Sequence, residues 1–478
     1  MSRTVIHWYR QDLRLPDNAA LALAAERGER VVPVYIWDLA GEGDWAPGAA
    51  GRWFLHHALD DLGRQIGRRG GRLVIEQGPA LEVLRRLAQE SGAEAVYWNR
   101  RYEPAIRARD EEIKRALVED GLEARSCNSR LLLEPWEICT QAGDPYKVFT
   151  PFSRAARKEG FRAPVEVELE ALTFAREGPA GLALEDLGLL PERSWDERFP
   201  EYWEPTREGG WKRLEQFLAG PVKAYAKARD IPGEDGTSRL SPFLHWGLLG
   251  PREVAAALGP LSEQGEGART FFNELLWREF AHHVLFHFPH TPEEPLQPHF
   301  SAFPWRKAPA QLEAWQKGQT GYPIVDAGMR QLWAVGWMHN RVRMVVASFL
   351  VKHLLLPWQA GERWFWETLV DADLANNTLG WQWAGGCGAD AAPYFRVFNP
   401  MTQGKKFDPE GDYVRTWVPE LKDLPKQYLH EPWTAPAEVL ERAGVDLGGN
   451  YPEPIVDHKE GRERALEAFQ TMKERRHA

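Results

Sequence analysis

Residues 31–37 read VVPVYIW, an unbroken apolar run, and a helical pattern of apolar residues follows at 52–68. The same alternation extends to both sides of this pair. Further strands are predicted at 5–9, 73–75 and 95–98, and further helices at 19–27, 80–89 and 106–117. Strands that alternate with helices predict an α/β domain built on a doubly wound parallel sheet.

The second half of the chain has a different pattern. From residue 211 onward the spacing is almost wholly helical, for example at 270–287 and 325–352, with Pro and Gly between the helices. Before it, residues 163–204 carry 11 acidic residues against three Arg and show no long period, which is typical of an exposed connector. We therefore predict an α/β domain at 1–133, an acidic connector at 134–210 and a large all-α domain at 211–478.

Composition narrows the class of protein. The chain has 478 residues, 43% hydrophobic and 27% charged, which excludes a disordered chain. The net charge is −10, but the connector contributes −8 of it, so the overall acidity does not exclude a phosphate-rich partner.

No apolar run approaches the roughly 20 residues that cross a bilayer. The widely spaced Cys127, Cys139 and Cys387 fit neither a zinc site nor a disulfide framework. We expect a cytoplasmic monomer without a metal site or a membrane contact.

A dinucleotide motif is present only in form. Residues 41–46 read GEGDWA and match the G-x-G-x-x-G/A pattern. The match follows the second strand rather than the first, and Glu42 and Asp44 stand where a pyrophosphate would approach. Pro47 also interrupts the helix that the motif requires. A classical dinucleotide-binding role is therefore disfavoured.

Two short segments of the helical half have polar residues that suit a ligand. Residues 236–241 read GTSRLS and precede a helix, so their hydroxyls and amides suit phosphate oxygens, although an ordinary N-cap explains them equally well. Glu274, Trp277 and Arg278 lie within one helical turn. They could serve a site, or Glu274 could simply pair with Arg278.

Two longer segments are more specific. Residues 321–360 contain one acid, four Arg or Lys residues and interleaved Trp and Met, a composition typical of a face that binds phosphates and stacks bases. A solvated helix with an apolar inner face is the alternative. Residues 371–383 read DADLANNTLGWQW. Such acids and amides are costly to bury unpaired, so they indicate a polar ligand.

These stretches together resemble the photolyase/cryptochrome family of blue-light flavoproteins, and most of all its bacterial cyclobutane pyrimidine dimer photolyases of class I and class III. The resemblance extends over nearly the whole chain. It includes residues 7–14 (HWYRQDLR), 98–102 (WNRRY), 274–280 (ELLWREF), 320–326 (TGYPIVD), 336–341 (GWMHNR) and 395–400 (FRVFNP). It implies an N-terminal α/β domain and a C-terminal helical domain that holds FAD.

The resemblance also implies roles for single residues around FAD. Asn377 matches the position that faces flavin N5, where an Asn favours a repair enzyme. Trp381, Trp358 and Trp305 match the family's electron relay from the flavin to the surface. The implied FAD contacts are Tyr225, Thr237, Ser238, Arg239, Ser241, Arg278, Asn340, Arg343, Asp371, Asp373 and Asn377, with Arg343 paired to Asp371.

The implied activity is light-driven repair of UV-damaged DNA. Photoexcited FADH⁻ would donate one electron to a cyclobutane pyrimidine dimer flipped out of the duplex, and the electron would return after the dimer splits. Trp277, Met344 and Trp383 would hold the flipped bases, and Glu274 would hydrogen-bond the pyrimidine edge. Arg341 and Arg396 would contact the flanking phosphates. A cryptochrome-type photoreceptor and a photolyase for the (6-4) photoproduct are the alternatives.

The family also uses a second, antenna chromophore. Residues 43–53 resemble the class III subgroup, in which a folate is bound. There Trp45 would stack on the pterin and Glu42 would bond its amidine edge. We therefore expect methenyltetrahydrofolate rather than a deazaflavin.

Overall fold

The computed structural model describes residues 3–27, 29–175, 178–192, 194–260, 263 and 265–477. The chain forms two compact units that interleave along the sequence. Unit 1 comprises Met1–Ala219, Ser238–Pro289 and Val370–Ala375, and unit 2 comprises Gly220–Thr237, His290–Leu369 and Asn376–Ala478. Each unit is described by itself.

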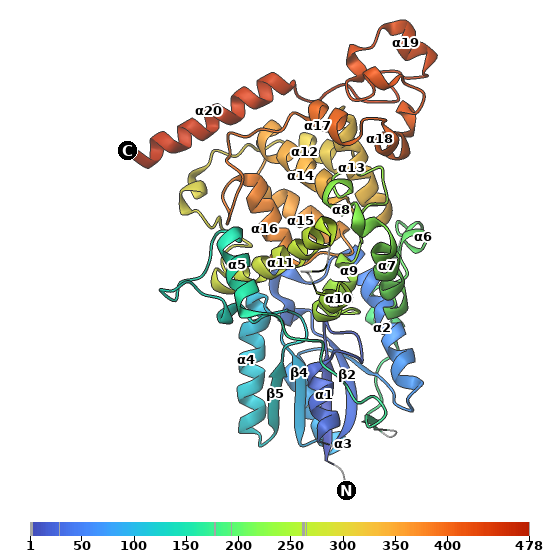
Figure 1. Ribbon diagram of the computed structural model, residues 1–478, viewed down its shortest axis with the longest axis vertical. Coiled ribbons are helices and arrows are strands. Elements are labelled where there is room, and N and C mark those ends of the chain that lie inside the picture. Colours follow the sequence, from blue (N-terminus) through green and yellow to red (C-terminus); the bar gives the residue numbers. More distant parts are fainter. Residues whose placement is uncertain are drawn as a thin grey trace. The chain divides into compact units, whose positions relative to one another are not determined.

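Unit 1 contains a parallel sheet with the strand order β3-β2-β1-β4-β5 (Figure 1). A short sixth strand pairs with the start of β2, at Arg30 and Val31, where β3 does not reach. All pairings between these strands are parallel, as predicted. The strands are β1 (Thr4–Tyr9), β2 (Arg30–Trp37), β3 (Val74–Gln77), β4 (Ala95–Asn99), β5 (Glu123–Cys127) and β6 (Thr173–Phe174).

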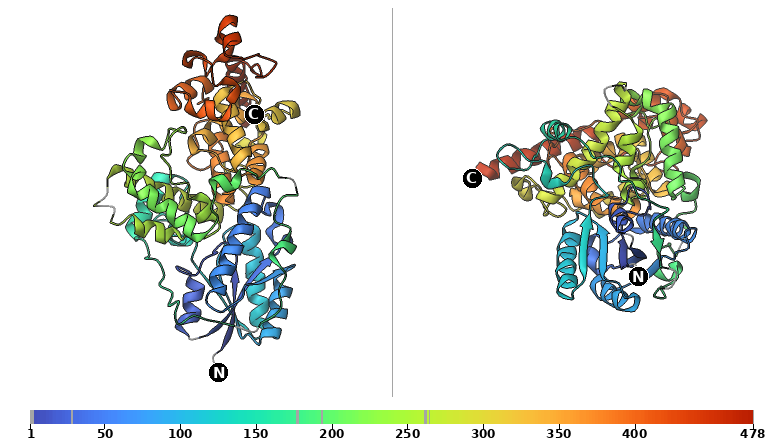
Figure 2. Two further views of the ribbon diagram at one scale, coloured as in Figure 1. Left: turned by 90° about the vertical axis from the view of Figure 1, so that its right-hand side faces the viewer. Right: turned by 60° about the horizontal axis from the view of Figure 1, so that its bottom comes forward.

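Helices cover both faces of this sheet (Figure 2). Ile6 and Trp8 face one core with α3 and α4, whereas α1 contacts β1, β4 and β5. Ile6 and Trp8 share a face because side chains two residues apart on a strand point to the same side of the sheet. The helices of unit 1 are α1 (Ala19–Glu26), η1 (Ala40–Trp45), α2 (Ala49–Gly67), α3 (Ala80–Ser91), α4 (Pro104–Glu119), η2 (Pro135–Glu137), α5 (Phe149–Glu159), η3 (Leu184–Leu187), α6 (Phe199–Tyr202), α7 (Arg207–Ala219), α9 (Ser241–His245), α10 (Pro251–Ala257) and α11 (Glu266–His287).

Unit 2 is helical throughout the elements assigned to it. Helix α16 (Leu374–Gly385) begins in unit 1 and continues in unit 2. The others are η4 (Pro221–Lys223), α8 (Tyr225–Ala228), η5 (Pro298–Ala302), α12 (Pro309–Gln316), α13 (Pro323–Val335), α14 (Asn340–Ser348), the π-helix η6 (Phe349–His353), α15 (Trp358–Thr368), α17 (Pro400–Phe407), α18 (Asp412–Trp417), η7 (Pro419–Leu421), η8 (Lys426–Tyr428), η9 (Pro432–Thr434), α19 (Ala437–Arg442) and α20 (His458–His477). The parallel sheet and the helical C-terminal region confirm the predicted fold class.

Two details differ from the sequence-based expectation. The continuous helical pattern at 325–352 is divided, because Gly336 adopts a left-handed conformation (φ 65°) and ends α13. The last turn of this stretch is the π-helix η6. Strand β5 was not predicted, since its sequence EARSC is largely polar and only Ala124 is buried.

The carboxyl ends of the strands carry polar residues that hold unit 1 together. Arg14 follows β1, is fully buried, and donates to the carbonyl oxygens of Gly247 (2.9 Å) and Ser129 (2.7 Å). Its guanidinium thus joins the sheet to the segment around α9. The described part of the chain contains no helix long and apolar enough to cross a membrane.

Candidate functional site

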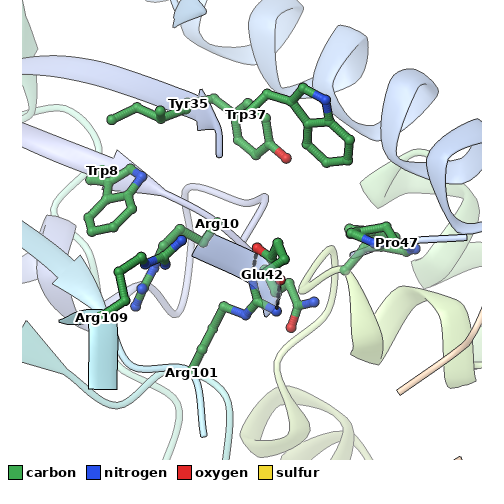
Figure 3. A pocket seen from close by; sticks show the side chains of 11 residues that line it. Trp8, Arg10, Tyr35, Trp37, Glu42, Pro47, Arg101 and Arg109 are labelled. Carbon is green, nitrogen blue, oxygen red and sulfur yellow. Dashed lines mark hydrogen bonds and ion pairs between the residues drawn. The ribbon is translucent and has the colours of Figure 1, made fainter. Parts of the chain in front are cut away.

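A pocket opens at the carboxyl edge of the sheet in unit 1 (Figure 3). This edge includes the point where the strand order reverses between β1 and β4, a usual place for ligands in α/β sheets. The space measures about 350 Å³ with its open mouth included. Its lining is Trp8, Arg10, Gln11, Tyr35, Ile36, Trp37, Glu42, Pro47, Arg101, Arg109 and Trp246.

A bidentate ion pair lies in this pocket. Both carboxylate oxygens of Glu42 accept hydrogen bonds from Arg101, at 2.6 and 2.8 Å (Figure 3). Arg101 also binds Glu103 at 3.2 Å. Burial opposes the charge of Arg101, but the two carboxylates outweigh burial and raise the pKa of its guanidinium above the usual value. The pocket therefore presents a fixed carboxylate and guanidinium among aromatic rings.

The two residues that the sequence suggested for an antenna differ in position. Glu42 lines the pocket, as a ligand contact must. Trp45 ends η1, is partly buried, and does not belong to the residues that line the pocket. The aromatic lining comes instead from β1, β2 and Trp246. Of these, Trp246 was singled out by no motif.

A second buried network holds Asp373. Its Oδ2 accepts a hydrogen bond from Arg130 at 2.7 Å and lies 3.5 Å from both His245 and His282. Burial disfavours the charged carboxylate, but the contacts with His282, His245 and Arg130 prevail and hold the pKa of Asp373 well below its usual range. Arg130 follows β5 and was not predicted. No sequence signal pointed to it, because β5, which ends three residues earlier, is largely polar and was itself not predicted.

The other predicted FAD contacts of unit 1 lie in the loop before α9 (Ser238 and Arg239), on α9 and α11, and in the segment before α16. Ser241 donates to Asp371 at 2.6 Å. Arg239, in the loop before α9, has a φ of 51°, a left-handed conformation that non-glycine residues keep mainly at functional sites. Nη1 of Arg278 donates hydrogen bonds to the carbonyl oxygen of Arg130 and to Oε1 of Glu279. Its buried Nη2 has no hydrogen-bond partner among the described residues. This orphaned donor is suited to a bound polar group.

Unit 2 carries the remaining predicted FAD contacts. Asn377 is buried and donates through Nδ2 to the carbonyl oxygen of Glu362 at 3.0 Å, so its orientation is fixed. The Thr378 hydroxyl bonds Glu362 Oε1 at 2.6 Å. Burial raises the pKa of Glu362 well above the usual value, which favours the neutral form of this neighbour of Asn377. The others in unit 2 are Tyr225, which is buried, Thr237 and Arg343, which are partly buried, and Asn340, which is exposed.

Two of the predicted relay tryptophans of unit 2 lie on helices, Trp358 on α15 and Trp381 on α16, and the third, Trp305, lies in the segment between η5 and α12. The indole of Trp381 lies against Gly361, one turn after Trp358, and Gly385 lies against Trp358. Trp381 and Trp358 are each only 2% exposed, whereas Trp305 is partly exposed. Of the three, Trp305 is thus the one that reaches the surface. Phe365 and Trp315 also meet Trp381, at ring-centroid distances of 5.0 and 6.1 Å, and were not predicted.

The residues predicted to bind the lesion occur in both units. In unit 1, Glu274 and Trp277 are partly exposed on α11, and Trp277 stacks on Phe149. In unit 2, Arg341 pairs with Asp230 at 2.8 Å. The other three in unit 2 are Met344 and Trp383, which are partly buried, and Arg396, which is exposed. Phe149 and Asp230 were missed, because neither belongs to a recognisable motif. The described residues include no cluster of three or more His, Cys, Asp or Glu that could hold a metal ion.

Comparisons with known proteins match both halves of the chain. Residues 5–170 match the DNA photolyase family model, and residues 271–471 match the FAD binding domain of DNA photolyase. A deoxyribodipyrimidine photo-lyase of Agrobacterium fabrum is 48% identical, covering 98% of each chain. Cryptochrome-2 of Arabidopsis thaliana is 39% identical over 99% of this chain and 80% of its own.

Solved structures agree with these sequence matches. A bacterial class III photolyase from Agrobacterium tumefaciens superposes with a TM-score of 0.95 at 47% identity, covering 99% of this chain and 98% of its own.

Proposed function

The chain belongs to the photolyase/cryptochrome family, and on that premise we propose that it splits cyclobutane pyrimidine dimers in UV-damaged DNA under blue light. It is an enzyme of the deoxyribodipyrimidine photolyase type, a carbon–carbon lyase. The observation that carries the proposed substrate is the pair Glu274 and Trp277 on α11. Both are partly exposed on a helix whose other residues are mostly buried.

FAD is the cofactor, and the residues present fit it. The orphaned Nη2 of Arg278 needs an acceptor, and the Asn377 amide offers a neutral polar group beside Glu362, whose pKa burial raises well above the usual value. When bound in its reduced form, FAD supplies the electron that blue light sends to the dimer. We assign its contacts to Tyr225, Thr237, Ser238, Arg239, Ser241, Arg278, Asn340, Arg343, Asp371, Asp373 and Asn377.

Trp305 before α12, Trp358 on α15 and Trp381 on α16 are suited to an electron relay. Trp305 is partly exposed and can take an electron from a reductant in solution, whereas Trp358 and Trp381 are shielded from water. Indole rings can be oxidised and reduced one after another. We propose that these three side chains pass an electron inward and keep the enzyme in its active state.

The lesion would be held through its flipped bases. Trp277 offers an apolar ring, and base–aromatic contact contributes about 1–3 kcal/mol per base. Glu274, one turn away, can bond the pyrimidine edge and stabilise the charge that develops there. Met344 and Trp383 are the further base contacts that we assign, and Arg341 and Arg396 the phosphate contacts.

The test is a repair assay with photoreduced, FAD-loaded protein. Oligonucleotides with a single thymine cyclobutane dimer or a single (6-4) photoproduct are compared in blue light and in darkness. Light-dependent loss of the cyclobutane dimer alone is the expected result. Repair of the (6-4) lesion alone would contradict the assigned substrate. Repair of neither, with FAD bound and photoreducible, would favour a photoreceptor of the cryptochrome type.

We propose further that the pocket of unit 1 holds the antenna chromophore, methenyltetrahydrofolate. A pterin has a flat ring for the Trp and Tyr side chains and an amidine edge for a carboxylate, and Glu42 lines the pocket. Because both oxygens of Glu42 already bond Arg101, the ligand must share or displace that guanidinium. Glu42→Gln should lower chromophore occupancy without loss of FAD. A released chromophore that fluoresces as a deazaflavin would contradict the assignment.

A further inference from the structure

Trp277 does not stand alone on α11, because Phe149 covers one face of its indole. The two ring centroids are 3.7 Å apart and the ring planes differ by 7°. Both rings are partly exposed. A closely stacked pair at the surface is unusual, since aromatic pairs generally prefer offset or edge-to-face contacts with centroids 4.5–7 Å apart.

The neighbouring rings restrict both members of this pair. Phe280 meets Trp277 edge-on at 5.8 Å and Phe149 at 6.0 Å. The indole is therefore bounded on one face by Phe149 and along an edge by Phe280. A base that approaches Trp277 can use only the remaining face or the remaining edges.

The backbone that carries Phe149 is anchored independently of its ring. Phe152, one turn later in α5, is 2% exposed and packs on Phe280 and His283. The amide of Tyr146 donates to His283 Nε2 at 3.0 Å, and His283 Nδ1 pairs with the carbonyl oxygen of Pro135. Burial lowers the pKa of His283 to about 4, so this neutral anchor persists at ordinary pH. Removal of the Phe149 ring should therefore leave α5 in place.

We propose that Phe149 is a positioning residue for lesion binding, which fixes the indole of Trp277 before the DNA arrives. This inference rests on the proposed function, in which Trp277 contacts the flipped bases. A side chain held in its bound orientation loses less conformational entropy on binding, so affinity rises without any direct contact to the ligand. Phe149 itself need not touch the DNA.

The test is a double-mutant cycle on dark binding of an oligonucleotide with one cyclobutane dimer to the FAD-loaded protein. Phe149→Ala should weaken binding about 2- to 12-fold, the range that corresponds to one aromatic pair. Phe149→Trp should restore most of the affinity. In the Trp277→Ala background, the same Phe149→Ala change should have almost no further effect. Binding of undamaged duplex should stay the same throughout.

The matched control is Phe161→Ala. Phe161 meets the same helix α11 through Phe272, at 5.1 Å and edge-to-face, away from Trp277. It should leave lesion affinity unchanged. Equal losses from Phe149→Ala with and without Trp277 would show a merely structural role and overturn the inference, while the proposed function would stand. If Trp277→Ala alone leaves lesion affinity unchanged, the assignment of Trp277 fails as well.

Discussion

Gly361 gives the most quantitative prediction about the packing of the relay. It lies within α15 under the indole of Trp381, and a Cβ at this position would lie 2.6 Å from Cζ2 and still closer to Cζ3 and Cη2. Carbon atoms in contact are normally about 3.5–4.0 Å apart, so the nearest ring atom would have to move by about 1.5 Å or more. Trp381 is only 2% exposed and has no solvent to move into.

The expected cost of Gly361→Ala combines two opposing effects. Overpacking a core costs typically 1–3 kcal/mol, and a clash with a large buried ring belongs at about the upper end of that range. Alanine in place of glycine inside a helix gains about 1 kcal/mol. We predict a net loss of about 2 kcal/mol in the free energy of unfolding, together with slower light-driven reduction of bound FAD.

Gly380→Ala is the matched control for this substitution. Gly380 precedes Trp381 on α16, is exposed, and a Cβ there meets nothing within 4 Å. The same Gly-to-Ala change should therefore raise the free energy of unfolding by up to about 1 kcal/mol and leave photoreduction unchanged. Urea unfolding of the FAD-loaded proteins, followed by circular dichroism, measures the free energy of unfolding of both variants. Gly361→Ala protein as stable as the unmodified protein would refute the packing argument.

Three further predictions address the relay, the sheet edge and the DNA contacts. Trp305→Phe should block light-driven reduction of oxidised FAD and spare repair by enzyme reduced beforehand; lost repair in the pre-reduced enzyme would show that the relay assignment is incomplete. Burial opposes the charge of Asp12, but bonds from His7, the Arg10 amide and Asn99 lower its pKa to about 2. A carboxyl group whose pKa is lower in the folded than in the unfolded protein stabilises the fold at pH values above its unfolded pKa. This stabilisation is lost as the pH falls through the folded pKa. The free energy of unfolding of Asp12→Asn should therefore lack about 2 kcal/mol of pH dependence between about pH 4 and 2. Asp230→Asn should release Arg341 from its ion pair, tighten DNA binding and steepen its salt dependence by up to about one phosphate contact; an unchanged salt slope would show that Arg341 does not reach the DNA.

The sheet could be predicted because its buried strands are short apolar runs between turns. β1, β2 and β4 were all found within about one residue of their ends. β5 was missed, since its residues are mostly polar and little buried. The helical pattern at 325–352 did not reveal its break, because a single Gly336 is compatible with a helix until its left-handed φ is seen.

The site was only partly visible in the sequence for a different reason. Motif residues such as Glu274, Asn377 and Trp381 were named from a resemblance. Their partners come from distant places in the chain: Arg130 bonds Asp373 across 243 residues, and Phe149 stacks on Trp277. No local pattern carries such pairs. The compact units also interleave along the chain, and the division at 1–133, 134–210 and 211–478 stays a prediction.

The claim that α11 carries the lesion chemistry is tested most directly by the quantum yield of dimer splitting. Photoreduced unmodified protein and Glu274→Ala, both loaded with FAD, are compared at saturating dimer-containing oligonucleotide under blue light. We predict that the unmodified protein splits the dimer and that the variant, with FAD still bound, does so with a yield lower by roughly twofold or more, as expected for one lost hydrogen bond. Equal quantum yields would contradict the account.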